Sequence, residues 1–179
     1  MQRAPVAAER AFSSDAFALL GLPAQYDLDP QVIEAAFFER SKQVHADKFA
    51  TAPAAERVAA LSKSRALNDA YQVLKKPVSR AEYLLELAGV TIGDNERIDA
   101  DTIMSVMAAR EELAEARVAG DTAKLEALQA DMRTRRTQAL AELPGLFTGS
   151  DMVGVKRVLI ALRYIDRYLE ECDAALDED

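Results

Sequence analysis

Two amphipathic segments joined by a short polar loop constrain the fold of this 179-residue chain more than any other feature. Asp29 and Pro30 predict the start of a helix that runs to about Val44, because aspartate caps free N–H groups and proline suits the first helical position. A second helix begins after residues 51–53 and ends before Pro77, which cannot continue it. Helices joined by a short loop pack antiparallel, so we expect a helical hairpin with an exposed tip.

The tip holds His45, the only histidine of the chain, together with Asp47. A lone histidine is typical of a solvated loop or a satisfied structural position. A metal site needs several ligands, and the only cysteine, Cys172, is more than a hundred residues away, so no bound metal is expected. No nucleophile or base in a motif accompanies His45, which argues against catalysis. The remaining interpretation is a surface that another protein recognises.

Composition and charge set the broad class. Ala, Leu, Glu and Arg are abundant and aromatic residues make up only 6%, which indicates an all-α fold. No apolar run approaches about 18 residues, so we expect no membrane span. Residues 1–76 have a net charge of +1 and residues 77–179 a net charge of −9, and this acidic part argues against nucleic acid as a partner. A single cysteine and the lack of an apolar signal core predict a cytoplasmic protein.

A short helix is predicted before the hairpin, over residues 16–20. Ser14 or Asp15 can cap it, and Gly21 ends it. Residues 1–12 are expected to be a frayed tail.

A fourth helix is predicted after the hairpin. Ser79 and Glu82 have the spacing of a capping box, which predicts that the helix starts at Ser79. Gly89 ends it, and a polar connector follows at residues 90–100.

Three more amphipathic helices are predicted in the rest of the chain. They run from about Asp101 to Ala119, from Asp121 to the pair at 144–145, Pro-Gly, and from about Ser150 to Leu176. Apolar residues three and four apart mark the bundle seam of the last helix: Val155, Val158, Leu162, Ile165, Leu169, Cys172 and Leu176. On this seam Cys172 is interpreted as a small buried residue. The short loops predict an antiparallel three-helix bundle.

The first bundle helix carries a second apolar face. Its core side is predicted to comprise Val106, Ala109, Leu113 and Ala116. The opposite side should be polar, yet it presents a mixed set: Met104, Met107, Ala108, Glu111 and Glu115. Either another part of the chain covers the methionines, or adaptable thioethers and a carboxylate rim form a recognition surface. We favour the recognition surface.

These motifs resemble a known family. A helix, a loop of the His-x-Asp-Lys-Phe type and a long helix with Asn-Asp-Ala-Tyr at 68–71 resemble a J-domain, which stimulates ATP hydrolysis by DnaK-type chaperones. The strings FALLGLP at 17–23, YDLD at 26–29 and RAEYLL at 80–85 narrow the resemblance to the HscB family of iron–sulfur cluster assembly, over about residues 12–172. One position departs from the family pattern, because Ala46 stands where the family has proline.

The resemblance implies two protein partners, no enzyme activity and no cofactor. A J-domain at residues 1–89 is expected to dock on an HscA/DnaK-type ATPase chaperone through His45, Asp47, Lys48, Arg40 and Lys42. The bundle at residues 101–179 is expected to bind an IscU-type iron–sulfur scaffold through Ile103, Met104, Met107, Glu111, Glu115 and Tyr164. The expected function is delivery of the scaffold to the chaperone with stimulation of its ATPase.

Two other functions are considered. In the first, the chain is a scaffold-binding adaptor whose J-domain is impaired by Ala46. Without proline the loop backbone is freer, and His45 can then join one more turn of the preceding helix. In the second, the chain is a small enzyme or metalloprotein centred on His45, and purified protein would then contain a stoichiometric metal ion.

Overall fold

The computed structural model describes residues 15–93, 96 and 100–177, with side chains from residue 104 onward in the last range. The expected tail at 1–12 lies outside the described residues. Within them every regular element is a helix, which confirms the all-α prediction. None of the described helices combines the length and the apolar character needed to cross a membrane. The chain divides into two compact units, Met1–Arg80 and Ala81–Asp179.

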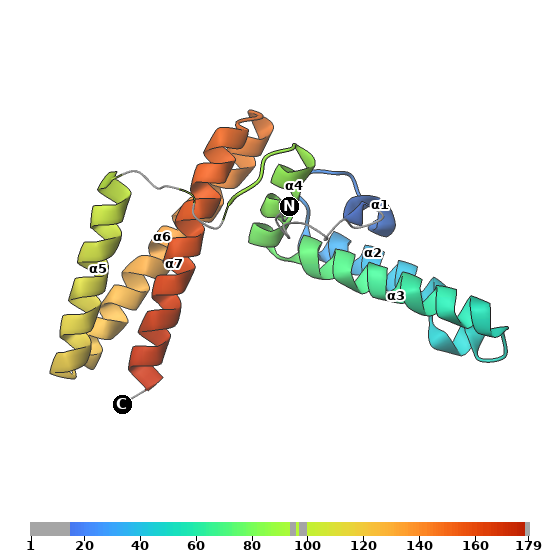
Figure 1. Ribbon diagram of the computed structural model, residues 1–179, viewed down its shortest axis with the longest axis horizontal. Helices are drawn as coiled ribbons and strands as arrows, with labels where there is room; N and C mark the ends of the chain where they lie inside the picture. Colours follow the sequence, from blue (N-terminus) through green and yellow to red (C-terminus); the bar gives the residue numbers. More distant parts are fainter. Residues whose placement is uncertain (1–14, 94–95, 97–99, 178–179) are drawn as a thin grey trace, which may run out of the picture. The chain divides into compact units, whose positions relative to one another are not determined.

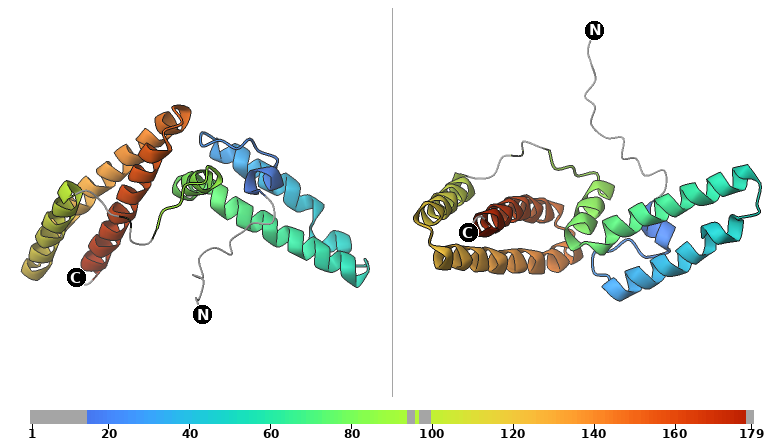
Figure 2. Two further views of the ribbon diagram at one scale, coloured as in Figure 1. Left: turned by 45° about the horizontal axis from the view of Figure 1, so that its top comes forward. Right: turned by 90° about the horizontal axis from the view of Figure 1, so that it is seen from below.

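The first unit is built on an antiparallel hairpin of α2 (Pro30–Gln43) and α3 (Ala54–Lys75), as Figure 1 and Figure 2 show. A single 3₁₀ turn, η1 (Ala46–Phe49), lies at its tip, and α1 (Ala16–Leu20) packs on both long helices. The hairpin helices end within two residues of their predicted limits. The interior is filled by large apolar side chains that include Phe17, Leu20, Ile33, Leu67 and Leu74.

The predicted starts of α1 and α2 are confirmed. The Asp29 carboxylate accepts from the N–H of Gln31 at 2.8 Å, and the Asp15 carboxylate accepts from the N–H of Phe17 at 3.0 Å. Gly21 ends α1 with a φ of +71°, a left-handed conformation that glycine adopts without strain. These caps satisfy backbone donors that a helix start otherwise leaves unpaired.

α4 (Pro77–Leu87) begins two residues before the predicted Ser79. Lys76 is extended, with φ −95° and ψ 125°, because a residue before proline avoids the helical region. Its carbonyl accepts from the N–H of Arg80 at 2.9 Å, so Pro77 both ends α3 and opens α4. Ser79 lies inside the helix, and the capping-box prediction is wrong.

Arg80 is buried at the end of the first unit. Its guanidinium donates to the carbonyl of Leu74 at 2.9 Å, near the C-terminal end of α3, and lies 5.3 Å from the ring centre of Tyr26. A cation at this end of a helix is stabilised by the exposed carbonyl groups. Burial holds the pKa of Arg80 below its ordinary value, and the nearby Tyr26 and Asp27 offset part of that effect. Arg80 therefore closes the C-terminal end of α3.

The second unit is a bundle of α5 (Ala100–Ala119), α6 (Thr122–Thr148) and α7 (Met152–Asp177), which lie side by side in Figure 1 and Figure 2. α6 and α7 make the most extensive contact, and α5 packs less extensively on both. The predicted seam of α7 is confirmed, since Val155, Leu162 and Cys172 are fully buried. One cluster joins all three helices: Leu113, Ala116, Leu125, Met132, Tyr168, Cys172 and Ala175.

α6 continues through Pro144, where the sequence predicted its end. Proline removes one backbone donor, and here this loss falls in the last turns of a 27-residue helix. Leu146 and Phe147, which follow the proline, are half-buried, so extending the helix gains apolar burial that offsets the missing hydrogen bond. The N–H of Gly149 then closes the helix on the carbonyl of Gly145 at 2.9 Å.

Candidate functional site

The tip of the α2–α3 hairpin exposes His45 and Asp47. α2 ends at Gln43, and His45 is extended with φ −62° and ψ 136°. His45 caps η1 instead, because its carbonyl accepts from Lys48 N–H at 3.0 Å and its Nδ1 accepts from Asp47 N–H at 3.4 Å. The His45 and Asp47 side chains are 64% and 89% exposed. The idea that Ala46 lets His45 join α2 is therefore wrong.

The predicted cations beside the tip point in different directions. Lys48 lies on η1 and is exposed. The Lys42 ammonium bonds to the Glu39 carboxylate at 2.6 Å, which lowers the pKa of Glu39. The Arg40 guanidinium lies so close to Gly21 that a side chain at residue 21 would clash with it. Lys48 is thus the cation at the tip itself, while Arg40 reaches back toward α1.

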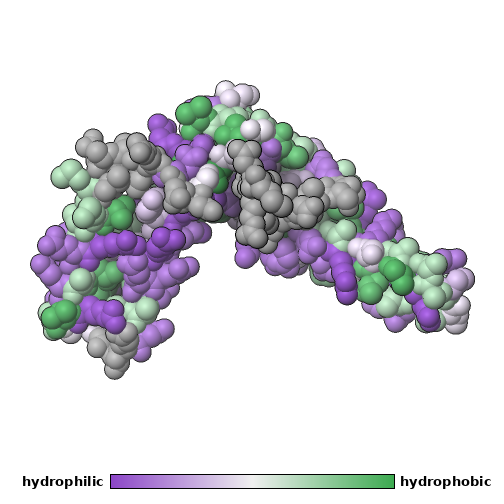
Figure 3. All heavy atoms as spheres, viewed as in Figure 1, coloured by the Kyte–Doolittle hydropathy of each residue, from purple (hydrophilic) through white to green (hydrophobic). Residues whose placement is uncertain are grey.

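The exposed face of α5 has the composition that the sequence predicted. Met104 and Met107 are 69% and 65% exposed, so no described part of the chain covers them. Ala108, Glu111 and Glu115 are exposed as well, whereas the side chain of Ile103 lies outside the described residues. Figure 3 shows hydrophobic residues among hydrophilic ones over α5. We call Met104, Met107, Glu111 and Glu115 the α5 face.

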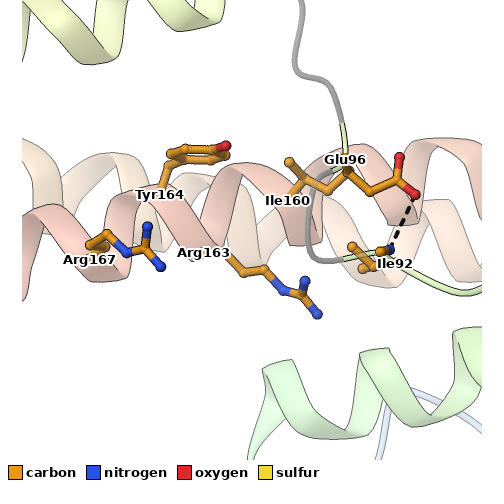
Figure 4. Close-up of a pocket in the computed structure, with 7 residues that line it drawn as sticks. Ile92, Glu96, Ile160, Arg163, Tyr164 and Arg167 are labelled. Atoms are coloured by element: carbon orange, nitrogen blue, oxygen red, sulfur yellow. Dashed lines mark hydrogen bonds between the residues drawn. The ribbon is translucent and has the colours of Figure 1, made fainter. Parts of the chain in front are cut away.

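Tyr164 on α7 is half-buried and lines two cavities. The first is an apolar cavity of about 360 Å³ that includes Val106 and Ala109 of α5 and Met132 of α6. The second, of about 270 Å³, lies along α7 between Ile92 and Arg167 and is shown in Figure 4. Tyr164 therefore lies between the side of α5 that packs into the bundle and the second cavity.

Sequence reasoning singled out Tyr164 but missed two arginines beside it, Arg163 and Arg167, which line the second cavity. The available signal was their spacing, since residues four apart share one face of a helix. Arg163 donates through Nε and Nη2 to one carboxylate oxygen of Glu82, at 3.3 and 3.0 Å. Figure 4 shows both arginine side chains extending along the same side of α7.

A carboxylate of the connector also lines this cavity. The Glu96 carboxylate accepts from the Lys156 ammonium at 2.6 Å and from the N–H of Gly93 at 3.3 Å, and both contacts hold the pKa of Glu96 below its usual range. The Glu96 carboxylate is therefore already paired within the protein, and its ion pair with Lys156 holds this part of the connector on α7.

The remaining titratable groups of the bundle interior are structural. Tyr168 donates its hydroxyl proton to the carbonyl of Ala109 at 3.1 Å, and burial raises the pKa of Tyr168 to about 12. Burial also raises the pKa of the Cys172 thiol, as expected for a small residue on the seam. In the described part of the chain, no three His, Cys, Asp or Glu side chains are grouped to hold a metal ion.

Comparison with known proteins identifies the family. The chain is 34% identical over 166 residues to the co-chaperone protein HscB homolog of Azoarcus sp. (strain BH72), which covers 91% of this chain and 94% of the relative. The chain belongs to the HscB co-chaperone family. The HscB homolog of Burkholderia thailandensis is also 34% identical, over 90% of this chain and 93% of its own length. Residues 98–173 match the family model of the HSCB C-terminal oligomerisation domain.

Solved HscB structures have the same fold. HscB from Vibrio cholerae has a TM-score of 0.79 and 33% identity, covering 92% of this chain and 99% of its own. Human co-chaperone HscB has a TM-score of 0.81 at 24% identity, covering 90% and 82%. The fold is thus an N-terminal J-domain with a helical C-terminal domain, as the resemblance predicted. The protein is a co-chaperone and not an enzyme, and its role implies a chaperone partner.

Proposed function

We propose that this HscB-family co-chaperone delivers an IscU-type iron–sulfur scaffold protein to an HscA/DnaK-type chaperone and stimulates the chaperone's ATPase. The observation that carries the proposal is the exposed tip, at which His45 and Asp47 contribute almost nothing to the protein's own core. Side chains that are exposed on a rigid turn, and are not needed for folding, are suited to recognising another protein. The J-domain, assigned to residues 1–89, supplies this contact.

The tip conformation supports an active J-domain in spite of Ala46. His45 has a ψ of 136°, which is the extended conformation that a following proline would impose. Ala46 opens a 3₁₀ turn, whose φ is close to the value that proline fixes. The loop therefore adopts the proline-compatible conformation with alanine in place. This argues against the adaptor with an impaired J-domain.

The α5 face supports scaffold binding by the domain at residues 101–179. Two exposed methionines form an adaptable apolar centre, and Glu111 and Glu115 follow as an acidic rim. Soluble chains seldom leave such side chains exposed together without a partner. The proposed contact residues are Ile103, Met104, Met107, Glu111, Glu115 and Tyr164.

Binding both partners to one chain explains delivery. A scaffold held by the bundle reaches the chaperone at a raised effective concentration once the J-domain has engaged. The chemistry of ATP hydrolysis belongs to the chaperone, and this chain contributes recognition alone.

The test is the ATPase rate of an HscA-type chaperone, titrated with this protein in the presence and absence of an IscU-type scaffold. We expect this protein to raise the rate alone, and the scaffold to raise it further. An unchanged rate under both conditions would contradict the proposal.

A further inference from the structure

We propose that Arg163 and Arg167 of α7 form a carboxylate-binding site, which takes one aspartate or glutamate side chain of the scaffold protein that docks on the α5 face. This inference rests on the proposed function, because it names the chemistry by which the same partner is oriented. The site is the cavity of about 270 Å³ between α7 and the connector.

The geometry of the cavity suits an anion. Arg163 and Arg167 lie one helical turn apart and extend along the same side of α7 in Figure 4. Ile92 and Ile160 contribute apolar walls. Such walls exclude part of the solvent and strengthen the attraction between a guanidinium and a bound anion.

Among the described charged side chains that line the cavity, Arg167 is the one without an ion-pair partner. Arg163 is bonded to Glu82, and the Glu96 carboxylate is engaged by Lys156 and by the N–H of Gly93. Asp166 is bonded to Arg136 of α6 at 2.6 Å. Among the described residues no carboxylate forms an ion pair with Arg167. Arg167 is therefore the cation that an incoming carboxylate would neutralise.

The two arginines also repel one another. Like charges four residues apart on a helix are destabilising. Arg163 uses only Nε and Nη2 for Glu82, so its Nη1 is available for a further contact. A carboxylate that bridges Arg163 and Arg167 would remove the repulsion, and the planar fork of a guanidinium matches the two oxygens of a carboxylate.

The neighbourhood of the cavity indicates that the carboxylate belongs to the partner on the α5 face. Tyr164 lines this cavity and is itself one of the proposed scaffold contacts, so the arginine site adjoins a residue of the proposed scaffold-binding set. The α5 face is acidic at Glu111 and Glu115, and the arginine site is basic. A partner that matches both must carry positive and negative groups at defined positions, which fixes its orientation.

The test is calorimetric titration of the full-length protein with a purified IscU-type scaffold. Arg167→Glu is expected to weaken binding about tenfold, and Arg167→Gln by about threefold, with smaller differences at high salt. Arg157→Glu is the matched control, because Arg157 is exposed on α7 and lines neither cavity. It should stay within about twofold of the unmodified protein. Circular dichroism and melting temperature verify that each variant is folded.

Two further measurements separate the inference from the proposed function. A scaffold in which the contacting aspartate or glutamate is replaced by lysine should restore binding to Arg167→Glu, and a scan of the scaffold's acidic residues identifies it. Met107→Ser tests the α5 face itself. If Met107→Ser weakens binding and Arg167→Glu does not, the carboxylate site is refuted and the proposed function stands. If neither variant weakens binding, the α5 face is not the docking surface, and both fall.

Discussion

The ring of Phe37 on α2 stacks on the ring of Tyr71 on α3, with ring centres 4.4 Å apart and 12° between the planes. The Lys75 ammonium lies 5.0 Å from the centre of the Tyr71 ring. The stacked pair joins the two helices that carry the tip. The packing of the hairpin therefore helps to hold the tip in place, in addition to the contacts of the tip's own residues.

Tyr71→Ala should lower the free energy of unfolding by about 2–3 kcal/mol, through lost burial and stacking at a half-buried site. Tyr71→Phe retains the ring and should stay within about 0.5 kcal/mol of the unmodified protein. Urea denaturation followed by circular dichroism measures both values. Equal midpoints for Tyr71→Ala and the unmodified protein would mean that the stacked pair does not stabilise the hairpin.

The stability of the bundle should fall at alkaline pH because of Tyr168. The folded state raises its pKa to about 12 from the ordinary 10.0. As the pH rises from 10 to 12 the unfolded chain loses the phenolic proton while the folded chain keeps it, so ionisation favours unfolding. The stabilisation that comes from the protonated Tyr168 is fully present below pH 10 and is lost as the pH rises through 12. The free energy of unfolding should fall by roughly 2–3 kcal/mol over this range.

Tyr168→Phe checks this account. It should cost about 1 kcal/mol at neutral pH, where the hydrogen bond to Ala109 is lost, and should show a much smaller alkaline decline. Tyr164→Phe is the control, and it should keep the full decline. Cys172, whose pKa burial also raises, is present in all three proteins, and only Tyr168→Phe removes its hydrogen bond with Tyr168. Parallel alkaline curves for Tyr168→Phe and Tyr164→Phe would exclude Tyr168 as the cause.

Replacing Met104 and Met107 with serine should weaken scaffold binding by about 2–4 kcal/mol, as for apolar residues at the centre of an interface. Both side chains are exposed, so the melting temperature should change little. Calorimetric titration and thermal unfolding give the two values. A large fall in melting temperature would show that the methionines pack against the protein's own chain.

Ala46→Pro should stabilise the protein by about 0.4–1 kcal/mol, because the loop already has a conformation that proline can adopt. The same change should raise ATPase stimulation through tighter chaperone binding, and leave scaffold binding unchanged. Thermal unfolding and a chaperone titration check both effects. Identical stimulation by the two forms would show that loop rigidity does not limit recognition.

The helical pattern of the sequence predicted most of the fold because local chemistry decides it. Asp15 and Asp29 cap the helices that the sequence assigned to them, and Asp121 caps the helix that was predicted to begin there. Gly21 and Gly120 follow helices with positive φ. The errors came from proline. Pro77 opens a helix that Ser79 was expected to cap, and Pro144 lies inside a helix that it was expected to end. At Pro144 the burial of neighbouring apolar residues outweighed the local signal, whereas at Pro77 the preference of proline for the first helical turn outweighed the capping signal of Ser79.

The candidate sites also include some features that the sequence predicted and others that it did not. Exposure of His45, Asp47, Met104 and Met107 followed from helical periodicity and loop position. The directions of the Arg40 and Lys42 side chains did not follow in this way. Arg40 lies against Gly21, which is distant in the sequence, and Lys42 is turned toward the Glu39 carboxylate by an ion pair. The cavity at Arg163 and Arg167 is formed by α7 and by the connector, which lie about 70 residues apart in the sequence. The periodicity of one helix carries no information about which distant segment packs against it.

The role of the tip is tested most directly by the chaperone's ATPase rate in the presence of Asp47→Asn. The Asp47 side chain is 89% exposed, so the substitution should leave helicity, melting temperature and scaffold affinity unchanged. We predict that it removes most of the stimulation that the unmodified protein gives at the same concentration. Full stimulation by a folded Asp47→Asn protein would contradict the assignment of the tip as the chaperone contact.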